Sequence, residues 1–198
     1  MKMFHANQSA HVTTARAARP LALLLLLLLS VSAAAKKHDP LTEAETDQLR
    51  EVAMEPQKRL QLYIKFADVR LTEMDRIRSD PKEAQGRGQR IHDLLEDFTA
   101  ILDEINDNLD QYQGRPLDKD LKKEFRKGLK EVLEAGAKWD ARLASLKSAV
   151  ASDPQTKKEF ADFRYVLQDA EEALKSTVDM AKEYSETKDA ESPAGKKK

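Results

Sequence analysis

The chain has 198 residues, of which 40% are hydrophobic and 35% are charged, and its formal net charge is −1. This balance fits one helical domain of ordinary size once any targeting segment is set aside. The absence of a basic excess argues against a nucleic-acid-binding protein. Cysteine is absent, which excludes disulfide bonds, thiol catalysis and thiolate metal sites.

The N-terminal part has the pattern of an export signal. Residues 1–20 carry scattered positive charge, and residues 21–35 form an uncharged, leucine-rich run. This run is shorter than the roughly 20 residues of a membrane-spanning helix, and its small-residue exit is typical of a secretory signal peptide. We predict cleavage after Ala33 or Ala35 and a periplasmic or extracellular chain without stable membrane insertion. The alternative is a retained signal anchor.

Two helices are predicted after this signal. Thr42 followed three residues later by Glu45 is a capping-box pattern, which opens a short helix over residues 43–54. Pro56 suits the first turn of a second helix over residues 56–78, where its missing N–H costs nothing. The second helix carries an apolar stripe with three- and four-residue spacing: Leu60, Ile64, Ala67, Leu71 and Met74.

A second apolar side on the same helix is formed by Leu62, Phe66 and Val69. Together the two sides span more than half of the helix circumference, which indicates contacts on two sides. Because a four-helix bundle buries one stripe of each helix, the second side needs its own cover. Either the preceding short helix folds over it with Leu49 and Val52, or another molecule does. Leu62, Phe66 and Val69 are therefore the candidate binding surface.

The next predicted helix, residues 91–112, ends before Gly114 and Pro116, as helices commonly do. Its apolar residues share one face: Ile91, Leu94, Leu95, Phe98, Ile101, Leu102, Ile105, Leu109 and Tyr112. Its acidic residues fill the opposite face: Asp93, Glu96, Asp97, Asp103, Glu104, Asp107 and Asp110. These acids would stay solvated, face the basic start of the following helix, or attract a basic partner.

Two longer helices follow. Asp118 caps a helix that runs to about residue 151, and its first turns carry six basic residues: Lys119, Lys122, Lys123, Arg126, Lys127 and Lys130. Gly128 and Gly136 lie on or beside its apolar face near Trp139, which we expect in the core. Glycine inside a helix costs about 1 kcal/mol relative to alanine, so a closely approaching neighbour is the expected compensation. The last helix starts at Pro154.

The short connections favour antiparallel neighbours. We predict an all-α domain over residues 36–187: an up-down bundle of four long antiparallel helices plus a short N-terminal helix. The alternative is an elongated pair of helical hairpins that dimerises. Residues 188–198 contain proline, glycine and three terminal lysines, and we predict a disordered tail.

No constellation for catalysis or cofactor binding is present, so we expect no catalytic, cofactor-binding or metal-binding residues. His92 and Glu96 are one helical turn apart and could touch a metal, but a zinc site usually needs three protein ligands. The sequence lacks a glycine-rich phosphate loop and a Gly-x-Ser-x-Gly elbow. The many carboxylates lie on polar helix faces, where nothing would raise a pKa for acid–base catalysis.

Two segments are similar to known families. Leu41-Thr42-Glu43-Ala44-Glu45, followed by Gln48-Leu49-Arg50-Glu51, resembles the Leu-Thr-x-x-Gln stretch of the Spy/CpxP group of periplasmic helical chaperones, with Glu45 in place of the glutamine. Residues 59–73, with Arg59-Leu60, Phe66-Ala67 and Arg70-Leu71-Thr72-Glu73, resemble a segment of exported bacterial helical domains of unknown function. The first resemblance implies a chaperone-like role, and the second implies no chemistry.

These observations favour a non-enzymatic exported protein that binds through a helix face, either to itself or to an envelope partner. The alternative is a periplasmic chaperone-like or stress-linked helical protein. A large exposed apolar patch would favour the chaperone, whereas an apolar stripe matched across a two-fold axis would favour self-association. A third hypothesis is a hydrolytic enzyme, which would need converging buried carboxylates.

Overall fold

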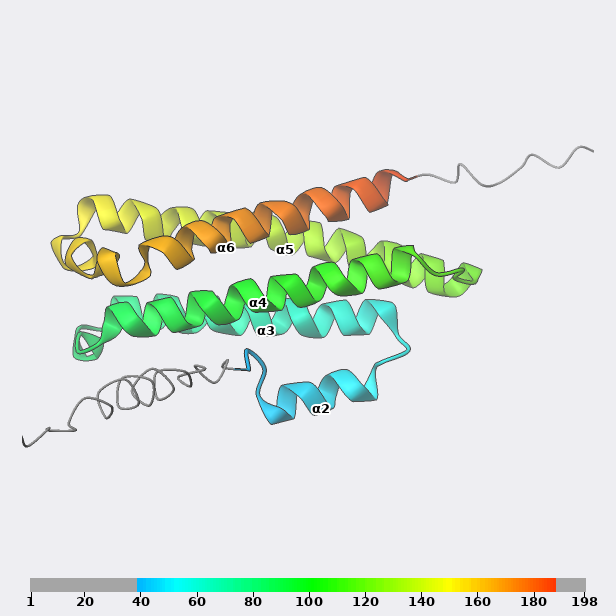
Figure 1. The fold of residues 1–198 in the computed structure, drawn as a ribbon, viewed down its shortest axis with the longest axis horizontal. Coiled ribbons are helices and arrows are strands. Elements are labelled where there is room, and N and C mark those ends of the chain that lie inside the picture. Colours follow the sequence, from blue (N-terminus) through cyan, green and yellow to red (C-terminus); the bar gives the residue numbers. More distant parts are fainter. Residues whose placement is uncertain (1–38, 188–198) are drawn as a thin grey trace, which may run out of the picture. The chain divides into compact units, whose positions relative to one another are not determined.

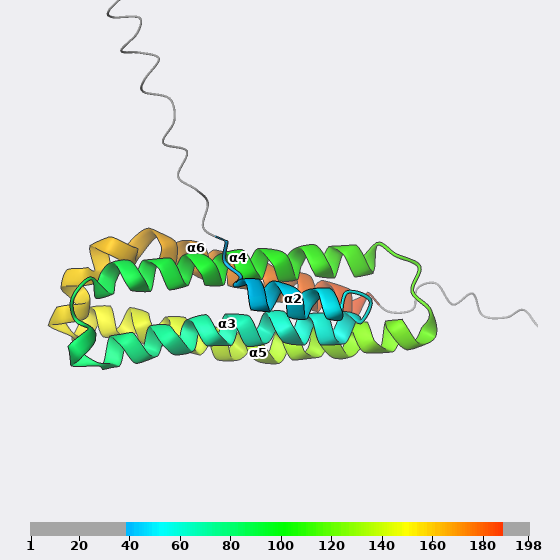
Figure 2. The ribbon, with the colours of Figure 1, turned by 90° about the horizontal axis from the view of Figure 1, so that it is seen from below.

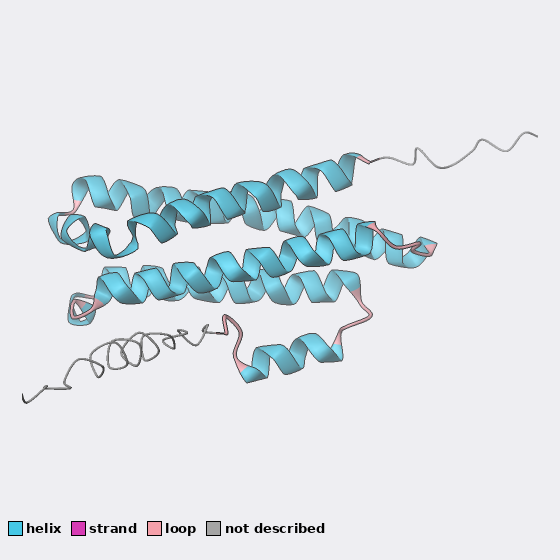
Figure 3. Ribbon diagram, viewed as in Figure 1, coloured by secondary structure: helices cyan, strands magenta, loops and turns pink. Residues whose placement is uncertain are grey.

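A computed structural model describes residues 39–187 as an all-helical domain (Figures 1 and 3). The predicted signal peptide with its cleavage site and the predicted C-terminal tail lie outside the described residues. Helix α2 (Glu43–Glu51) precedes four long helices: α3 (Pro56–Ser79), α4 (Arg87–Gln113), α5 (Lys119–Ser152) and α6 (Pro154–Glu186). A 3₁₀ turn, η1 (Pro81–Glu83), lies between α3 and α4. The predicted fold class is confirmed, and residues 39–187 contain no strand.

The helix boundaries follow local capping chemistry. At the start of α2, the Thr42 side chain accepts from the Glu45 N–H and the Glu45 carboxylate accepts from the Thr42 N–H, which is the predicted capping box. At the start of α5, the Asp118 side chain accepts from the Asp120 and Leu121 N–H groups. One start was predicted too late: α4 begins four residues before Ile91, because Gly86 adopts a left-handed φ of 64° and turns the chain directly into the helix.

The four long helices form two antiparallel hairpins, α3–α4 and α5–α6, that pack side by side in one chain. Helix α4 packs against α3 and α6, and α5 packs against the same two helices, so α4 and α5 lie on opposite corners of the bundle (Figures 1 and 2). The link between α4 and α5 therefore crosses the bundle diagonal. As a consequence, α3 and α5 are neighbours that run in the same direction, and so are α4 and α6.

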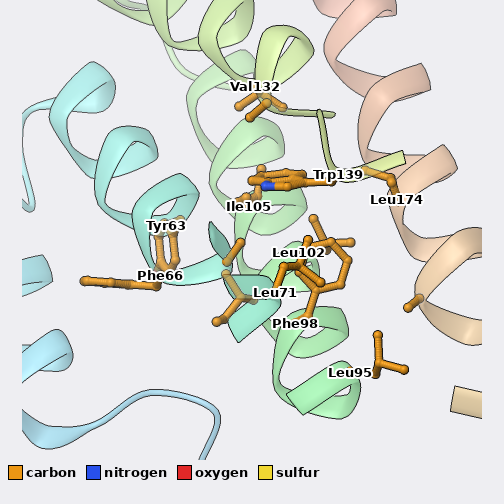
Figure 4. Packing of buried hydrophobic residues seen from close by; sticks show 14 of the residues in the cluster. Tyr63, Phe66, Leu71, Leu95, Phe98, Leu102, Ile105, Val132, Trp139 and Leu174 are labelled. Atoms are coloured by element: carbon orange, nitrogen blue, oxygen red, sulfur yellow. The ribbon is translucent and has the colours of Figure 1, made fainter. Parts of the chain in front are cut away.

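The predicted apolar stripes meet in one buried core. Trp139 is fully buried, as expected, and its ring packs edge-on against Phe98 with centroids 5.6 Å apart (Figure 4). Its indole N–H donates to Asp68 Oδ1 at 2.7 Å. This pairing matters because a buried indole N–H without a partner is costly.

The predicted close approaches at the α5 glycines are present, and each involves a different neighbour. A Cβ atom at Gly128 would lie 2.6 Å from Leu60 Cδ1 of α3, and one at Gly136 would lie 2.6 Å from Val178 Cγ2 of α6. Both distances are too short for a side chain to be added without a shift. The two glycines therefore allow α5 to pack closely against both α3 and α6.

Replacing Gly136 with leucine should overpack the contact between α5 and α6 and lower the free energy of unfolding by about 1–3 kcal/mol. Thermal and chemical denaturation measure the change. Ala137→Leu is the matched control, because Ala137 is exposed on the same helix and should tolerate the larger side chain. Equal stability of both variants would contradict a close contact at Gly136.

Candidate functional site

The structure divides the candidate surface of Leu62, Phe66 and Val69. Phe66 is only 2% exposed and belongs to the same buried cluster as Leu49 of α2. Leu62 is half-buried, and Val69 is 47% exposed. A continuous apolar face on α3 is therefore not available, because α2 lies over the seam between α3 and α4 (Figure 2).

The N-terminal end of α2 is held by Arg70, a buried arginine of α3. Its guanidinium donates to both carboxylate oxygens of Glu45, at 2.6 and 2.7 Å, and to the Pro40 carbonyl at 2.5 Å. Asp97 of α4 lies 3.5 Å from its Nε atom. Arg70 thus joins the start of the described chain to α3 and α4.

The C-terminal end of α2 is held by Arg59, three helical turns before Arg70. Arg59 donates to the Leu49 carbonyl, to Asn108 of α4 and to the Tyr63 hydroxyl. The Tyr63 hydroxyl in turn donates to Glu104 of α4. Burial raises the pKa of Tyr63, so this hydroxyl remains a donor at neutral pH. The contacts that hold α2 against the bundle are therefore mainly polar at both ends of α2.

The burial of Arg70 and the half-buried position of Arg59 were not predicted from the sequence. A signal for them exists: Arg59, Tyr63, Phe66 and Arg70 recur at intervals of three and four on the side of α3 that faces α2. An arginine at the edge of such a stripe is normally expected to extend its guanidinium into solvent. A buried arginine requires a carboxylate partner, and Glu45 was already assigned to the capping box.

Acid should release α2. Burial raises the pKa of Glu45, but hydrogen bonds from Arg70 and from the Thr42 backbone outweigh it, so the pKa lies below its ordinary 4.5. Because the pKa is lowered, the ionised Glu45 carboxylate stabilises the packing of α2 on the bundle above pH 4.5. This stabilisation is lost as the pH falls through the pKa of Glu45 in the folded protein. A dye on Met54→Cys, the only thiol in the chain, should lose anisotropy in that range.

The matched control for the acid release is Glu45→Gln in the same labelled chain. This variant cannot gain a proton at position 45, so its dye should already be mobile at neutral pH and should show no further step at this site. A step of unchanged size in the Glu45→Gln chain would place the titrating group elsewhere.

An open hollow lies beside Val69 on the outer side of α3. It has a volume of about 450 Å³, and a second hollow of about 200 Å³ continues between α3 and α5. Their residues mix apolar, acidic and basic side chains: Gln61, Ile64, Lys65, Asp68, Val69, Thr72, Glu73, Glu131, Glu134, Ala135 and Lys138. This mixture lacks the enclosed apolar lining and few convergent polar groups of a small-molecule site.

The outer side of α4 is an acidic face, which we define as its five exposed carboxylates: Asp93, Glu96, Asp103, Asp107 and Asp110. The other two predicted acids turn toward α3, where Asp97 lies by Arg70 and Glu104 accepts from Tyr63. Asp110 also accepts from Tyr184 of α6. Since α4 and α5 occupy opposite corners, the acidic face does not meet the basic start of α5.

The outer side of α5 begins with a basic face, which we define as six exposed cations: Lys119, Lys122, Lys123, Arg126, Lys127 and Lys130. At 100° per residue these positions fall within about 140° of arc. Lys130 lies 3.7 Å from Glu134, and both side chains are mostly exposed. None of the other lysines in this set forms a salt bridge within residues 39–187.

One group of possible metal ligands is present on α4. Ligand atoms of His92, Asp93 and Glu96 lie within 4.8 Å of one another. Asp93 already accepts a hydrogen bond from Gln89, and the group draws no ligand from a second helix. The arrangement is a solvated turn of one helix, and we assign it no metal.

Four described carboxyl groups, those of Glu45, Glu73, Glu83 and Asp153, have pKa values below their ordinary ones. Hydrogen bonds from Arg76 and Arg90 lower the pKa of Glu73 and Glu83 respectively, and hydrogen bonds from Thr156 lower that of Asp153. Lowered values stabilise the charged form, whereas a general acid needs a raised value.

No family model, curated protein or solved structure matches this chain. No helix within residues 39–187 is both long enough and apolar enough to cross a membrane.

Proposed function

We propose that this chain is a non-enzymatic exported protein that acts by binding through its helix faces, either to another copy or to an envelope partner. The observation that carries the proposal is the separation of charge on the bundle surface. The acidic face of α4 and the basic face of α5 are exposed on opposite corners of the bundle. Such blocks of one sign attract partners of the opposite sign and accelerate association.

Site-specific photo-crosslinking in the native envelope tests this proposal. A crosslinker at Asp107 on the acidic face or at Lys123 on the basic face should yield discrete adducts. The matched control is Glu172 of α6, which is also exposed but belongs to neither face. An absence of adducts at all three positions would contradict the proposal.

Mass spectrometry of the recovered chain should find Ala34 or Lys36 at its N-terminus, in support of export.

The second candidate is a chaperone-like role, and the observation in its favour is the cover that α2 provides over Phe66. The large hydrophobic residues exposed in the described chain are Met54, Val69 and Tyr165, and they come from different elements. This scatter does not form the large patch that a client-binding surface needs. A chaperone-like role would therefore require α2 to move away.

A further inference from the structure

The acidic and basic faces lie at the same end of the bundle. The link Gly114–Asp118 joins the last turn of α4 to the first turn of α5, so the C-terminal part of α4 and the N-terminal part of α5 lie at one level (Figure 1). Asp103, Asp107 and Asp110 occupy that part of α4. The basic face spans 11 residues of α5, about 17 Å of helix at 1.5 Å per residue. A sideways displacement of one bundle would therefore bring the two faces together without a shift along the helices.

We infer that the partner of these faces is a second copy of this chain, with the basic face of α5 in one copy lying against the acidic face of α4 in the next. This inference rests on the proposed function and specifies its partner. The two helices of such a contact would be antiparallel, because α4 and α5 are antiparallel within one bundle. Gly128 lies beside Leu60 of α3, and the neighbouring Arg59 reaches Asn108 of α4. Lys123 and Lys127 would then lie opposite Asp110 and Asp107.

The diagonal placement of the faces determines the type of assembly. In a two-fold dimer one patch would have to satisfy both copies, and neither face is complementary to itself. Since the faces point in opposite directions, a molecule that uses its basic face still presents its acidic face to a third molecule. The contact is therefore head-to-tail, and association continues into chains unless a rotation closes a ring.

Sedimentation velocity of residues 36–198, which contain the whole bundle, tests the inference. The average sedimentation coefficient should rise with concentration in about 0.01 M salt, where the Debye length is about 30 Å. The chains should return to monomers in about 1 M salt, where the Debye length is about 3 Å. A monomer in low salt even at about 1 mM chain, or a dimer unaffected by salt, would overturn the inference.

Two charge-reversed variants sharpen the test. One carries Lys123→Glu and Lys127→Glu on the basic face, and the other carries Asp103→Lys and Asp107→Lys on the acidic face. Each variant reverses two charges of one face, which leaves a net charge of only +2 on the basic face or −1 on the acidic face, so its association should weaken roughly tenfold or more. The matched controls make the same charge changes on α6, with Lys157→Glu and Lys158→Glu, and with Asp169→Lys and Glu172→Lys, at exposed positions. These controls should associate like the unmodified chain.

Mixing the two reversed variants should restore association, because the intact acidic face of one variant can then meet the intact basic face of the other. A variant that had merely lost its fold would not be rescued in this way. Failure of the mixture to associate would overturn the inference. Adducts of Lys123 with an unrelated envelope protein, combined with a monomeric chain in low salt, would also overturn it while leaving the proposed function intact.

Discussion

Replacement of Arg87 by methionine is expected to lower the free energy of unfolding by about 3–5 kcal/mol, the usual cost of removing one partner of a buried ion pair. Arg87 is 6% exposed, and its guanidinium contacts the Glu159 carboxylate at 2.8 and 3.2 Å. It also donates to the Arg78 carbonyl at the end of α3. The side chain therefore joins α3, α4 and α6 at one end of the bundle.

The loss arises because Glu159 stays buried after Arg87 is removed. Its side chain is 11% exposed, and its remaining hydrogen-bond donor is Gln155. The double variant Arg87→Met with Glu159→Met removes both charges and should recover most of the stability. Urea denaturation of the single and double variants measures the difference. A single variant that loses less than about 1 kcal/mol would resemble a surface pair and would show that water solvates Glu159.

The fold could be predicted because each long helix carries one apolar stripe and clear terminal signals. Pro56, Asp118 and Pro154 fixed three starts to within a residue, since capping depends on neighbours in the sequence. Gly86 was harder, because a glycine before a helix can equally belong to a loop. Its left-handed φ belongs to the tertiary path from α3 into α4.

The packing partners of the helices were harder to predict from the sequence than the helices themselves. Short connections predict antiparallel sequence neighbours, and both hairpins satisfy this. The diagonal path from Gln113 to Lys119 depends on which faces pack together, and periodicity does not encode that choice. For this reason the sequence left open whether the acids of α4 face the cations of α5.

The candidate surface stays a prediction, and the burial of its residues shows how the structure divides it. The pattern identified a second apolar side on α3 and named α2 as a possible cover. Leu49 and Phe66 are buried as that cover requires, whereas Val69 stays exposed. The hydrogen bonds of Arg59 and Arg70 to α2 were not predicted, because long charged side chains at the edge of an apolar helix face usually reach solvent.

Deletion of residues 36–55 should leave a folded bundle that self-associates or binds unfolded client chains better than the intact protein. The four long helices keep their mutual contacts, while the side of α3 around Phe66 loses its cover. Burying a side chain as large as phenylalanine contributes about 1.5–3 kcal/mol, so its exposure makes the surface adhesive. Light scattering and a client-aggregation assay compare the truncated and intact forms.

The matched control is Phe66→Gln in the truncated chain, which removes the largest newly exposed apolar side chain and should reverse the gain. Salt separates this association from the contact between the α4 and α5 faces. Salt weakens an attraction between exposed charges, whereas excluded salts such as sulfate strengthen apolar burial. If sulfate increases the self-association of the truncated chain, the contact is apolar and forms through the α3 surface around Phe66. A truncated form that stays monomeric and binds no client would show that α2 covers no binding surface.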